Sequence, residues 1–155
     1  MDAAGLIVLL AELNADAAVA AEAAHKASLR ISATAPGHLE ACAYELARLY
    51  NILEKMFERI CEEFENHLEQ RGDYHERLIQ RLSLELEGIR PAFIPKDRVA
   101  DVRELKGFRH VTRHAYELEL KTDRLVARIA AAVSRDLPTW CAAFNQTVKT
   151  QQEWE

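Results

Sequence analysis

Two long stripes of apolar residues, separated by a Pro-Gly break, most constrain what this chain can fold into. In the first stripe apolar residues recur at alternating spacings of four and three, which keeps them on one face of an α-helix. Its members are Leu6, Leu10, Leu13, Ala17, Ala20, Ala24, Ala27 and Ile31. The second stripe repeats the spacing with larger side chains: Leu46, Tyr50, Leu53, Phe57, Ile60 and Phe64.

These stripes predict one long helix from about Ala4 to Ile31 and another from about His38 to Glu69. Pro36-Gly37 lies between them and breaks the helical pattern. A short connection between two long helices makes an antiparallel hairpin. The alanines of the first helix would face the larger residues of the second.

Shorter helices are predicted after the hairpin. One begins after the candidate N-cap Asp73 and runs to about Glu87, where Gly88 closes it. A proline-containing linker follows. Asp97 is a suitable N-cap for the next helix, which begins near Arg98.

The last part of the chain is also helical in pattern. Thr122 or Asp123 would cap a further helix, and the tripeptide 136–138, Asp-Leu-Pro, suits either a fresh helix start or a kink. No segment has the pattern of a strand. We therefore expect residues 1–155 to form a single all-α domain, an antiparallel helical bundle with two long N-terminal helices and three or more shorter ones.

Composition narrows the class of protein. The 155 residues, 49% of them hydrophobic, are enough for one globular domain with a core. Three widely spaced cysteines, Cys42, Cys61 and Cys141, predict reduced thiols in a cytoplasmic protein. A signal peptide begins with positive charge, whereas the acidic Asp2 precedes the short apolar run 6–10. That run therefore does not resemble a signal peptide. We expect no stretch to reach membrane-spanning length, so no membrane partner is predicted.

The charge is unevenly distributed. The net charge of −5 argues against non-specific binding of nucleic acid through bulk charge. Residues 96–128, however, contain 9 Lys/Arg and 6 Asp/Glu, a local charge of +3. This basic segment is compatible with a local phosphate site on an acidic protein.

The basic segment contains the densest cluster of side chains suited to chemistry: Arg109, His110, Arg113, His114 and Tyr116. Arginine has a planar cationic group that suits phosphate, and histidine exchanges a proton near neutral pH. Cleavage of a phosphodiester needs both functions. The cluster therefore predicts a site that acts on phosphodiesters.

The spacing inside the cluster predicts a helix end. Arg109 and His114 are five residues apart, which is about 140° around a helix axis, so they would not converge on an unbroken helix. His114 and Tyr116 share one side only in an extended segment. If the three act together, a helix ends near 109–112 and a turn follows.

The order of elements and the motif Arg109-x4-His114-x-Tyr116 resemble HEPN ribonucleases, and specifically the HepT-type toxins of MNT–HEPN toxin–antitoxin pairs. The resemblance implies a homodimeric, metal-independent endoribonuclease with no cofactor, in which the two motifs face each other. It also implies a nucleotidyltransferase antitoxin that adds AMP to Tyr116. RNA would be the substrate.

The resemblance also implies roles for individual residues. Arg109 would hold the scissile phosphate, and His114 would act as general base or general acid. His110 and Arg113 would support this pair. On the second helix, Asn51 and Glu54 lie close to the apolar stripe and are candidates for orienting the Arg/His pair.

Two alternative functions remain at the level of sequence. One is a non-catalytic helical module that dimerises and binds a nucleotidyltransferase. The other is a metal-binding four-helix bundle, suggested by the Glu-x-x-His sequence of Glu22 and His25, which occurs only once. His67 and His75, near several glutamates, suggest a second metal site, although a solvated acidic face explains that pattern better.

Overall fold

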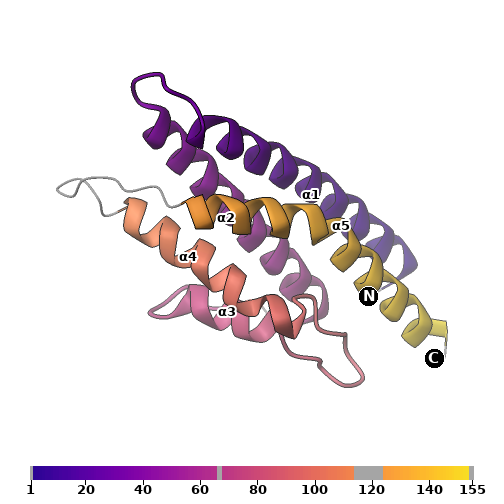
Figure 1. Ribbon diagram of the computed structural model, residues 1–155. Helices are drawn as coiled ribbons and strands as arrows, with labels where there is room; N and C mark the ends of the chain where they lie inside the picture. Colours follow the sequence, from indigo (N-terminus) through magenta and orange to yellow (C-terminus); the bar gives the residue numbers. More distant parts are fainter. Residues whose placement is uncertain (1, 66–67, 114–123, 154–155) are drawn as a thin grey trace.

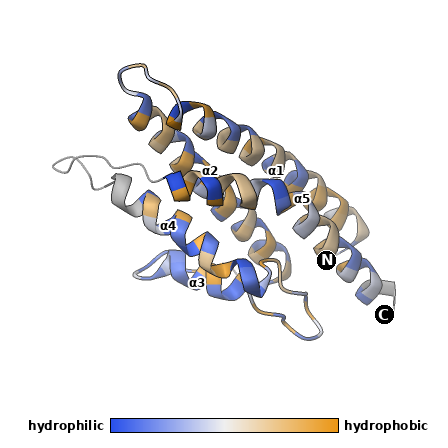
Figure 2. Ribbon diagram, in the orientation of Figure 1, coloured by the Kyte–Doolittle hydropathy of each residue, from blue (hydrophilic) through white to orange (hydrophobic). Residues whose placement is uncertain are grey.

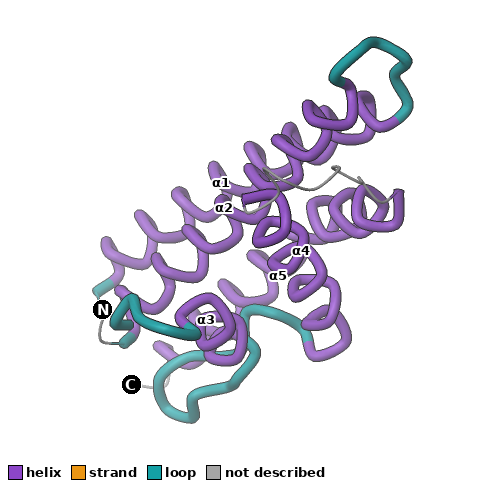
Figure 3. Tube along the Cα trace, turned by 90° about the vertical axis from the view of Figure 1, so that its left-hand side faces the viewer, coloured by secondary structure: helices purple, strands orange, loops and turns teal. Residues whose placement is uncertain are grey.

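A computed structural model describes residues 2–65, 68–113 and 124–153, and its regular elements are helices (Figures 1 and 3). The elements in chain order are α1 (Ala3–Ile31), α2 (His38–Phe64), α3 (Tyr74–Leu82), the 3-10 helix η1 (Lys96–Arg98), α4 (Val99–Arg113) and α5 (Arg124–Glu153). The described residues include no strand, and a single isolated bridge joins Leu86 to Arg90. The all-α prediction is therefore confirmed.

The predicted hairpin of two long helices is present. Asp2 caps α1 by accepting a hydrogen bond from the backbone nitrogen of Gly5 at 2.7 Å. Gly37 precedes α2 with φ of 81°, a left-handed conformation that glycine adopts without steric cost. α1 and α2 then pack along their lengths and lie side by side in both views (Figures 1 and 3). The small side chains of α1 allow this close approach, and five of its alanines are buried: Ala17, Ala20, Ala23, Ala24 and Ala27.

α2 is the central helix of the bundle. It contacts α1 and α5 on one side and α3 and α4 on another. Twelve of its residues are buried, including the carboxylates Glu45 and Glu54. Figure 2 shows the contrast between the more apolar α1 and the hydrophilic outer surface of α3. Two of its polar residues contact the neighbouring helices, Asn51 through Arg109 of α4 and Glu54 through His75 of α3.

α2 and α3 both end earlier than the sequence predicts. α2 ends at Phe64 instead of Glu69, and Glu65 is extended, with φ of −139°. α3 ends at Leu82 instead of Glu87, because Ser83 donates its hydroxyl to the Gln80 carbonyl at 2.7 Å. Such local side-chain bonds compete with continued helix.

The chain between α3 and η1 is held by a buried arginine. Residues 86–90 form a tight turn that includes Gly88 (φ 77°), so this glycine does not close a helix as predicted. Arg90 is fully buried and donates from Nη2 to Glu65 Oε1 at 2.6 Å. It also donates to the carbonyls of three residues, namely Arg81, Leu84 and Pro91. The segment predicted as a linker is thus fastened to the end of α2.

The same segment supplies part of the core. Phe93 packs edge-on against three aromatic rings, with centroid distances of 6.2 Å to Phe57, 6.2 Å to Trp140 and 5.7 Å to Phe144. These rings come from α2 and α5. Edge-to-face pairs of this kind add to the stability gained from burial. Phe93 therefore joins the connecting segment to both sides of the bundle.

α5 is one continuous helix, so of the two alternatives for the Asp-Leu-Pro tripeptide, a fresh helix start or a kink, the fresh start is wrong. Pro138 lies inside α5, where it removes one backbone hydrogen bond. Figure 1 shows the helix bending where its colour passes from orange to yellow. Buried Val133, Leu137 and Cys141 continue one apolar face through the proline, and this packing outweighs the local preference to break the helix.

Asp136 connects α5 to the start of α4. It pairs with Arg98 and, at 3.0 Å, with Arg135, and these two arginines lower the pKa of the Asp136 carboxyl to about 2. The Arg98 guanidinium also lies 5.8 Å from the ring centroid of Trp140. Asp97 is not an N-cap as predicted, because it lies inside η1.

The three cysteines are free and buried, in agreement with the prediction of reduced thiols. The expectation about membrane length is wrong, because α1 is long and apolar enough to cross a membrane by length and composition. Its alanines explain this result. In the structure the buried face of α1 packs against α2 and α5.

Removing the buried arginine is expected to destabilise the fold strongly. Arg90→Ala leaves the Glu65 carboxylate, 9% exposed, without its cation, which should lower the free energy of unfolding by about 3–5 kcal/mol. Urea denaturation followed by circular dichroism measures this loss. The control is Arg71→Ala, which removes an exposed ion pair to Glu69 and should cost under about 1 kcal/mol. Equal losses in the two variants would contradict the structural role of Arg90.

Candidate functional site

The predicted motif begins at the end of α4, and only part of it is described. α4 is helical as far as Arg113, one residue beyond the predicted range for its end. The side chains of His110 and Arg113 lie outside the described part of the chain. His114 and Tyr116, with the predicted turn, also lie outside the described residues. The geometry of the site is therefore built from Arg109 and the residues around it.

Arg109 is held against α2. Its Nε donates a hydrogen bond to Oδ1 of Asn51, one of the two α2 residues proposed from sequence to orient it. The Arg109 guanidinium carbon also lies 5.9 Å from the ring centroid of Tyr50. A planar guanidinium over an aromatic face gains from the negative charge of the ring face. These two contacts hold the cation in one orientation, because the hydrogen bond to Asn51 is directional and the Tyr50 ring restricts the plane of the guanidinium.

Glu54, the second α2 candidate, is one helical turn beyond Tyr50. It is 7% exposed, and its Oε2 accepts the Tyr50 hydroxyl at 3.0 Å. Burial, together with Glu54, raises the pKa of Tyr50 above its usual range, so the hydroxyl keeps its proton and donates. A buried carboxylate requires such donors, because burial without them is costly.

The second hydrogen-bond partner of Glu54 is His75, from the first turn of α3. Its Nδ1 pairs with the same Oε2 atom that the tyrosine hydroxyl contacts. The sequence pattern placed His75 in a metal site with His67, or on a solvated acidic face. His67 lies outside the described residues, and the structure places His75 against Glu54. The sequence did not predict this pair. The available signal was Glu54 itself, because a carboxylate beside the apolar stripe of α2 needs hydrogen-bond donors from another element.

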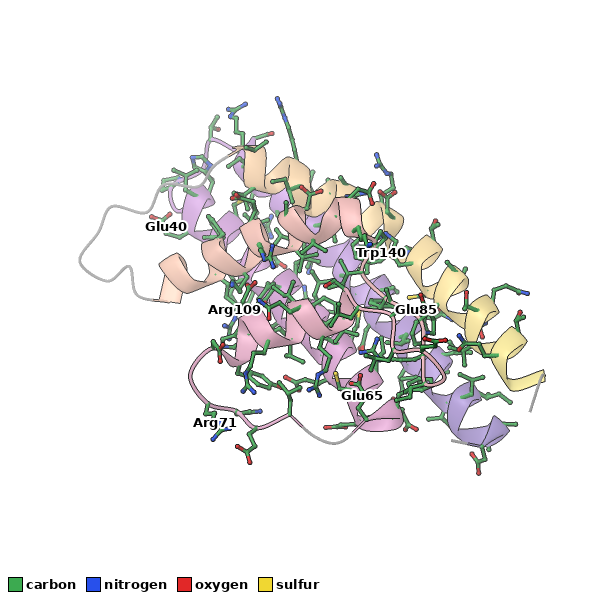
Figure 4. All side chains as sticks on the ribbon, turned by 90° about the horizontal axis from the view of Figure 1, so that it is seen from below. Glu40, Glu65, Arg71, Glu85, Arg109 and Trp140 are labelled. Atoms are coloured by element: carbon green, nitrogen blue, oxygen red, sulfur yellow. The ribbon has the colours of Figure 1, made fainter. Side chains whose placement is uncertain are left out.

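Arg109, Glu54 and His75 line one cavity of about 420 Å³. The rest of its lining comes from α2, the segment that connects α2 to α3, and the start of α3: Glu58, Gln70, Arg71, Gly72 and Tyr74. Figure 4 shows Arg109 on its helix and Arg71 on the nearby connecting segment. The cavity thus combines two arginines, two glutamates and a histidine, and its volume is within the usual range for ligand sites.

Two larger cavities contain none of the predicted site residues. One, of about 1040 Å³, lies among the end of α2, α3 and the turn at 86–90. The other, of about 480 Å³, lies between the connecting segment and α5. Size alone favours them, but neither brings a cation together with a histidine. The smaller cavity has the groups that phosphodiester chemistry requires.

The Glu22 and His25 side chains suggested as metal ligands do not form a metal site in the structure. Glu22 forms an ion pair with Lys26 at 2.9 Å, while His25 is exposed on α1. Within residues 2–65, 68–113 and 124–153, no group of three or more His, Cys, Asp or Glu side chains is arranged to hold a metal ion. The described geometry therefore offers no ligand set for the four-helix metal site.

Comparison with known proteins gives one match. A family model described as HepT-like protein matches residues 41–148, while curated proteins and solved structures give no match. The matched region runs from α2 into α5 and includes both the cavity and the Arg109-x4-His114-x-Tyr116 motif. Because the match covers more than half of the 155 residues, the chain belongs to the HepT-like protein family.

Proposed function

We propose that this protein is the toxin of a toxin–antitoxin pair and acts as a metal-independent endoribonuclease. Membership of the HepT-like family implies a HEPN-type toxin. The observation that carries the catalytic part is the placement of Arg109, which Asn51 and Tyr50 hold at the wall of a cavity that also contains a histidine. We place its action in the cytoplasm, where RNA is available.

In this proposal Arg109 binds the scissile phosphate. Its guanidinium stabilises the negative charge that develops on the phosphate oxygens during transfer. Asn51 and Tyr50 already constrain the Arg109 side chain, so less conformational entropy is lost when it binds the phosphate. His114 exchanges the proton, as the general base on the ribose 2′-hydroxyl or the general acid on the leaving oxygen. The product is a 2′,3′-cyclic phosphate.

His110 and Arg113 complete the basic end of α4 and are proposed to support Arg109 and His114. Both precede His114 in the sequence and belong to the segment of net charge +3. Local positive charge attracts the RNA backbone even when the whole protein is acidic. Asn51 and Glu54 support the site from α2, through Arg109 and the cavity wall respectively.

Loss of either motif residue is expected to abolish cleavage without unfolding the protein. Arg109→Ala and His114→Ala should each lower the rate of RNA cleavage by about a hundredfold or more, because they remove charge stabilisation and proton transfer respectively. Matched controls are Arg30→Ala and His25→Ala, which are exposed on α1 and line no part of the cavity. Circular dichroism checks that all four variants fold.

The same assay in EDTA tests the metal independence. Wild-type cleavage should be unchanged by the chelator. Full activity in His114→Ala would overturn the proposed mechanism, and activity lost to EDTA would favour a metal-dependent site instead. Wild-type protein that binds a nucleotidyltransferase but leaves RNA intact would support the non-catalytic module.

The protein is also proposed to be a homodimer with residues 109–116 at or beside the interface. One Arg/His motif is sparse for acid–base chemistry, and a two-fold contact doubles the set. Sedimentation at micromolar concentration should give the mass of two chains, and Arg113→Glu should weaken the dimer because it reverses a charge within the proposed interface segment. Arg135→Glu on α5 is the control. An active wild-type monomer would contradict this arrangement.

Tyr116 is the proposed regulatory residue, modified with AMP by a nucleotidyltransferase antitoxin. The added phosphate would compete with RNA for Arg109, and the added bulk would block the ribose. Co-expression with the antitoxin should add AMP mass at Tyr116, detected by peptide mass spectrometry. Tyr116→Phe should remain toxic in its presence.

The matched control is Tyr44→Phe, since Tyr44 is 68% exposed on α2 and lies outside the motif. This variant should still be neutralised by the antitoxin. Modification that appears on another residue, or neutralisation of Tyr116→Phe, would show that the regulatory residue is a different one.

A further inference from the structure

We propose that His75 is a second catalytic residue of this site and takes the proton from the ribose 2′-hydroxyl. This inference rests on the proposed ribonuclease function and assigns a role that the motif does not contain. His75 lies in the first turn of α3, with 45% of its side chain exposed. It lines the same cavity as Arg109, although the two residues are 34 positions apart in the sequence.

The hydrogen bond to Glu54 determines which nitrogen of His75 accepts a proton. A carboxylate oxygen only accepts, and Glu54 Oε2 already receives the Tyr50 hydroxyl. The His75 Nδ1 atom that contacts this oxygen must therefore carry the hydrogen. In the neutral ring the lone pair is then on Nε2, the nitrogen on the side away from Glu54. A general base needs this tautomer.

The ring of His75 is also restrained in orientation. Besides the bond to Glu54, it packs edge-on against Tyr74 with a centroid distance of 5.6 Å. Glu54 is in turn fixed by burial on α2 and by Tyr50. A carboxylate that holds an imidazole in one tautomer and stabilises its protonated form is the arrangement of carboxylate–histidine pairs in hydrolytic enzymes.

The cavity provides the complementary groups. Arg109 and Arg71 contribute positive charge, while Glu54 and Glu58 are the acidic residues that line the cavity from α2. A volume of about 420 Å³ suits one ribose with its phosphate. In this arrangement the phosphate of the RNA lies at Arg109 and the 2′-hydroxyl lies at His75.

The step balances with one proton accepted and one donated. The 2′-hydroxyl proton moves to His75 Nε2, and the 2′-oxygen forms a bond to phosphorus. The bond from phosphorus to the 5′-oxygen breaks, and that oxygen takes a proton from protonated His114. The products are a 2′,3′-cyclic phosphate and a 5′-hydroxyl. In this step His75 of the cavity is the general base and His114 of the motif is the general acid.

A bland alternative is that the His75–Glu54 pair only anchors α3 on α2. His75→Asn separates the two possibilities, because the asparagine amide can still donate to Glu54 but has no basic nitrogen. An anchoring role predicts full activity in this variant. A catalytic role predicts a loss of about a hundredfold or more at an unchanged melting temperature. His25→Asn, on the exposed face of α1, is the matched control.

The experiment uses two RNA substrates, one natural and one with sulfur in place of the bridging 5′-oxygen at the cleavage site. A thiolate leaves without protonation, so the sulfur substrate bypasses a general acid but still needs a general base. We expect His75→Asn to be impaired on both substrates. His114→Ala should be impaired on the natural RNA and largely restored on the sulfur RNA.

Each outcome decides a separate claim. Activity of His75→Asn within about threefold of wild type, while His114→Ala is inactive on natural RNA, would overturn the role of His75 and leave the proposed function intact. Rescue of His75→Asn by the sulfur substrate would overturn its assignment as the base. Wild-type protein that cleaves neither substrate would overturn the proposed function, and the role of His75 with it.

Discussion

The buried carboxylate of Glu54 is the constraint on which the arrangement of the site depends. A carboxylate this far from water requires hydrogen-bond donors. Tyr50 supplies one from the preceding turn of α2, and His75 supplies another from α3. Satisfying this one group therefore fixes α3 against α2. The same surface of α2 presents Asn51 to Arg109, so α4 is attached through neighbouring residues.

Packing on the opposite side of α2 holds the surface that carries Asn51 and Glu54 in place. Alanines on α1 allow the two long helices to approach closely, and α5 covers the same side. Beyond the end of α2, Arg90 fastens the connecting segment to Glu65, and Phe93 fills the space among rings from α2 and α5. The site thus lies on a helix that is immobilised from several directions, which suits chemistry that needs fixed geometry.

The apolar stripes that run along whole helices predicted the fold correctly, whereas the local signals for helix starts and ends were less reliable. The alternating spacing defined the hairpin because burial of a whole helix face dominates its stability. Pro138 did not start a helix, since buried Leu137 and Cys141 keep α5 in register. α2 and α3 ended early because Glu65 and Ser83 make side-chain contacts that spacing does not reveal.

The candidate residues on α4 and α2 were predictable from the pattern of each helix, although Asn51 and Arg109 are 58 positions apart. The α4 motif and the α2 candidates were visible from residue type and spacing, and the structure brings Asn51 into contact with Arg109. The sequence pointed to His75 only as a metal ligand or as part of an acidic face, and its contact with Glu54 was not predicted. Long-range pairs of this kind follow from how α3 docks on α2, which no local pattern encodes.

The chemical ends of cleaved RNA test the central claim most directly. Purified protein is incubated with a defined single-stranded RNA in EDTA, and the fragments are examined by mass spectrometry. A site that contains an arginine and histidines, and works without a metal, transfers the phosphate to the neighbouring 2′-oxygen. The account predicts 2′,3′-cyclic phosphate and 5′-hydroxyl ends. Fragments with 3′-hydroxyl and 5′-phosphate ends, or RNA left intact, would contradict it.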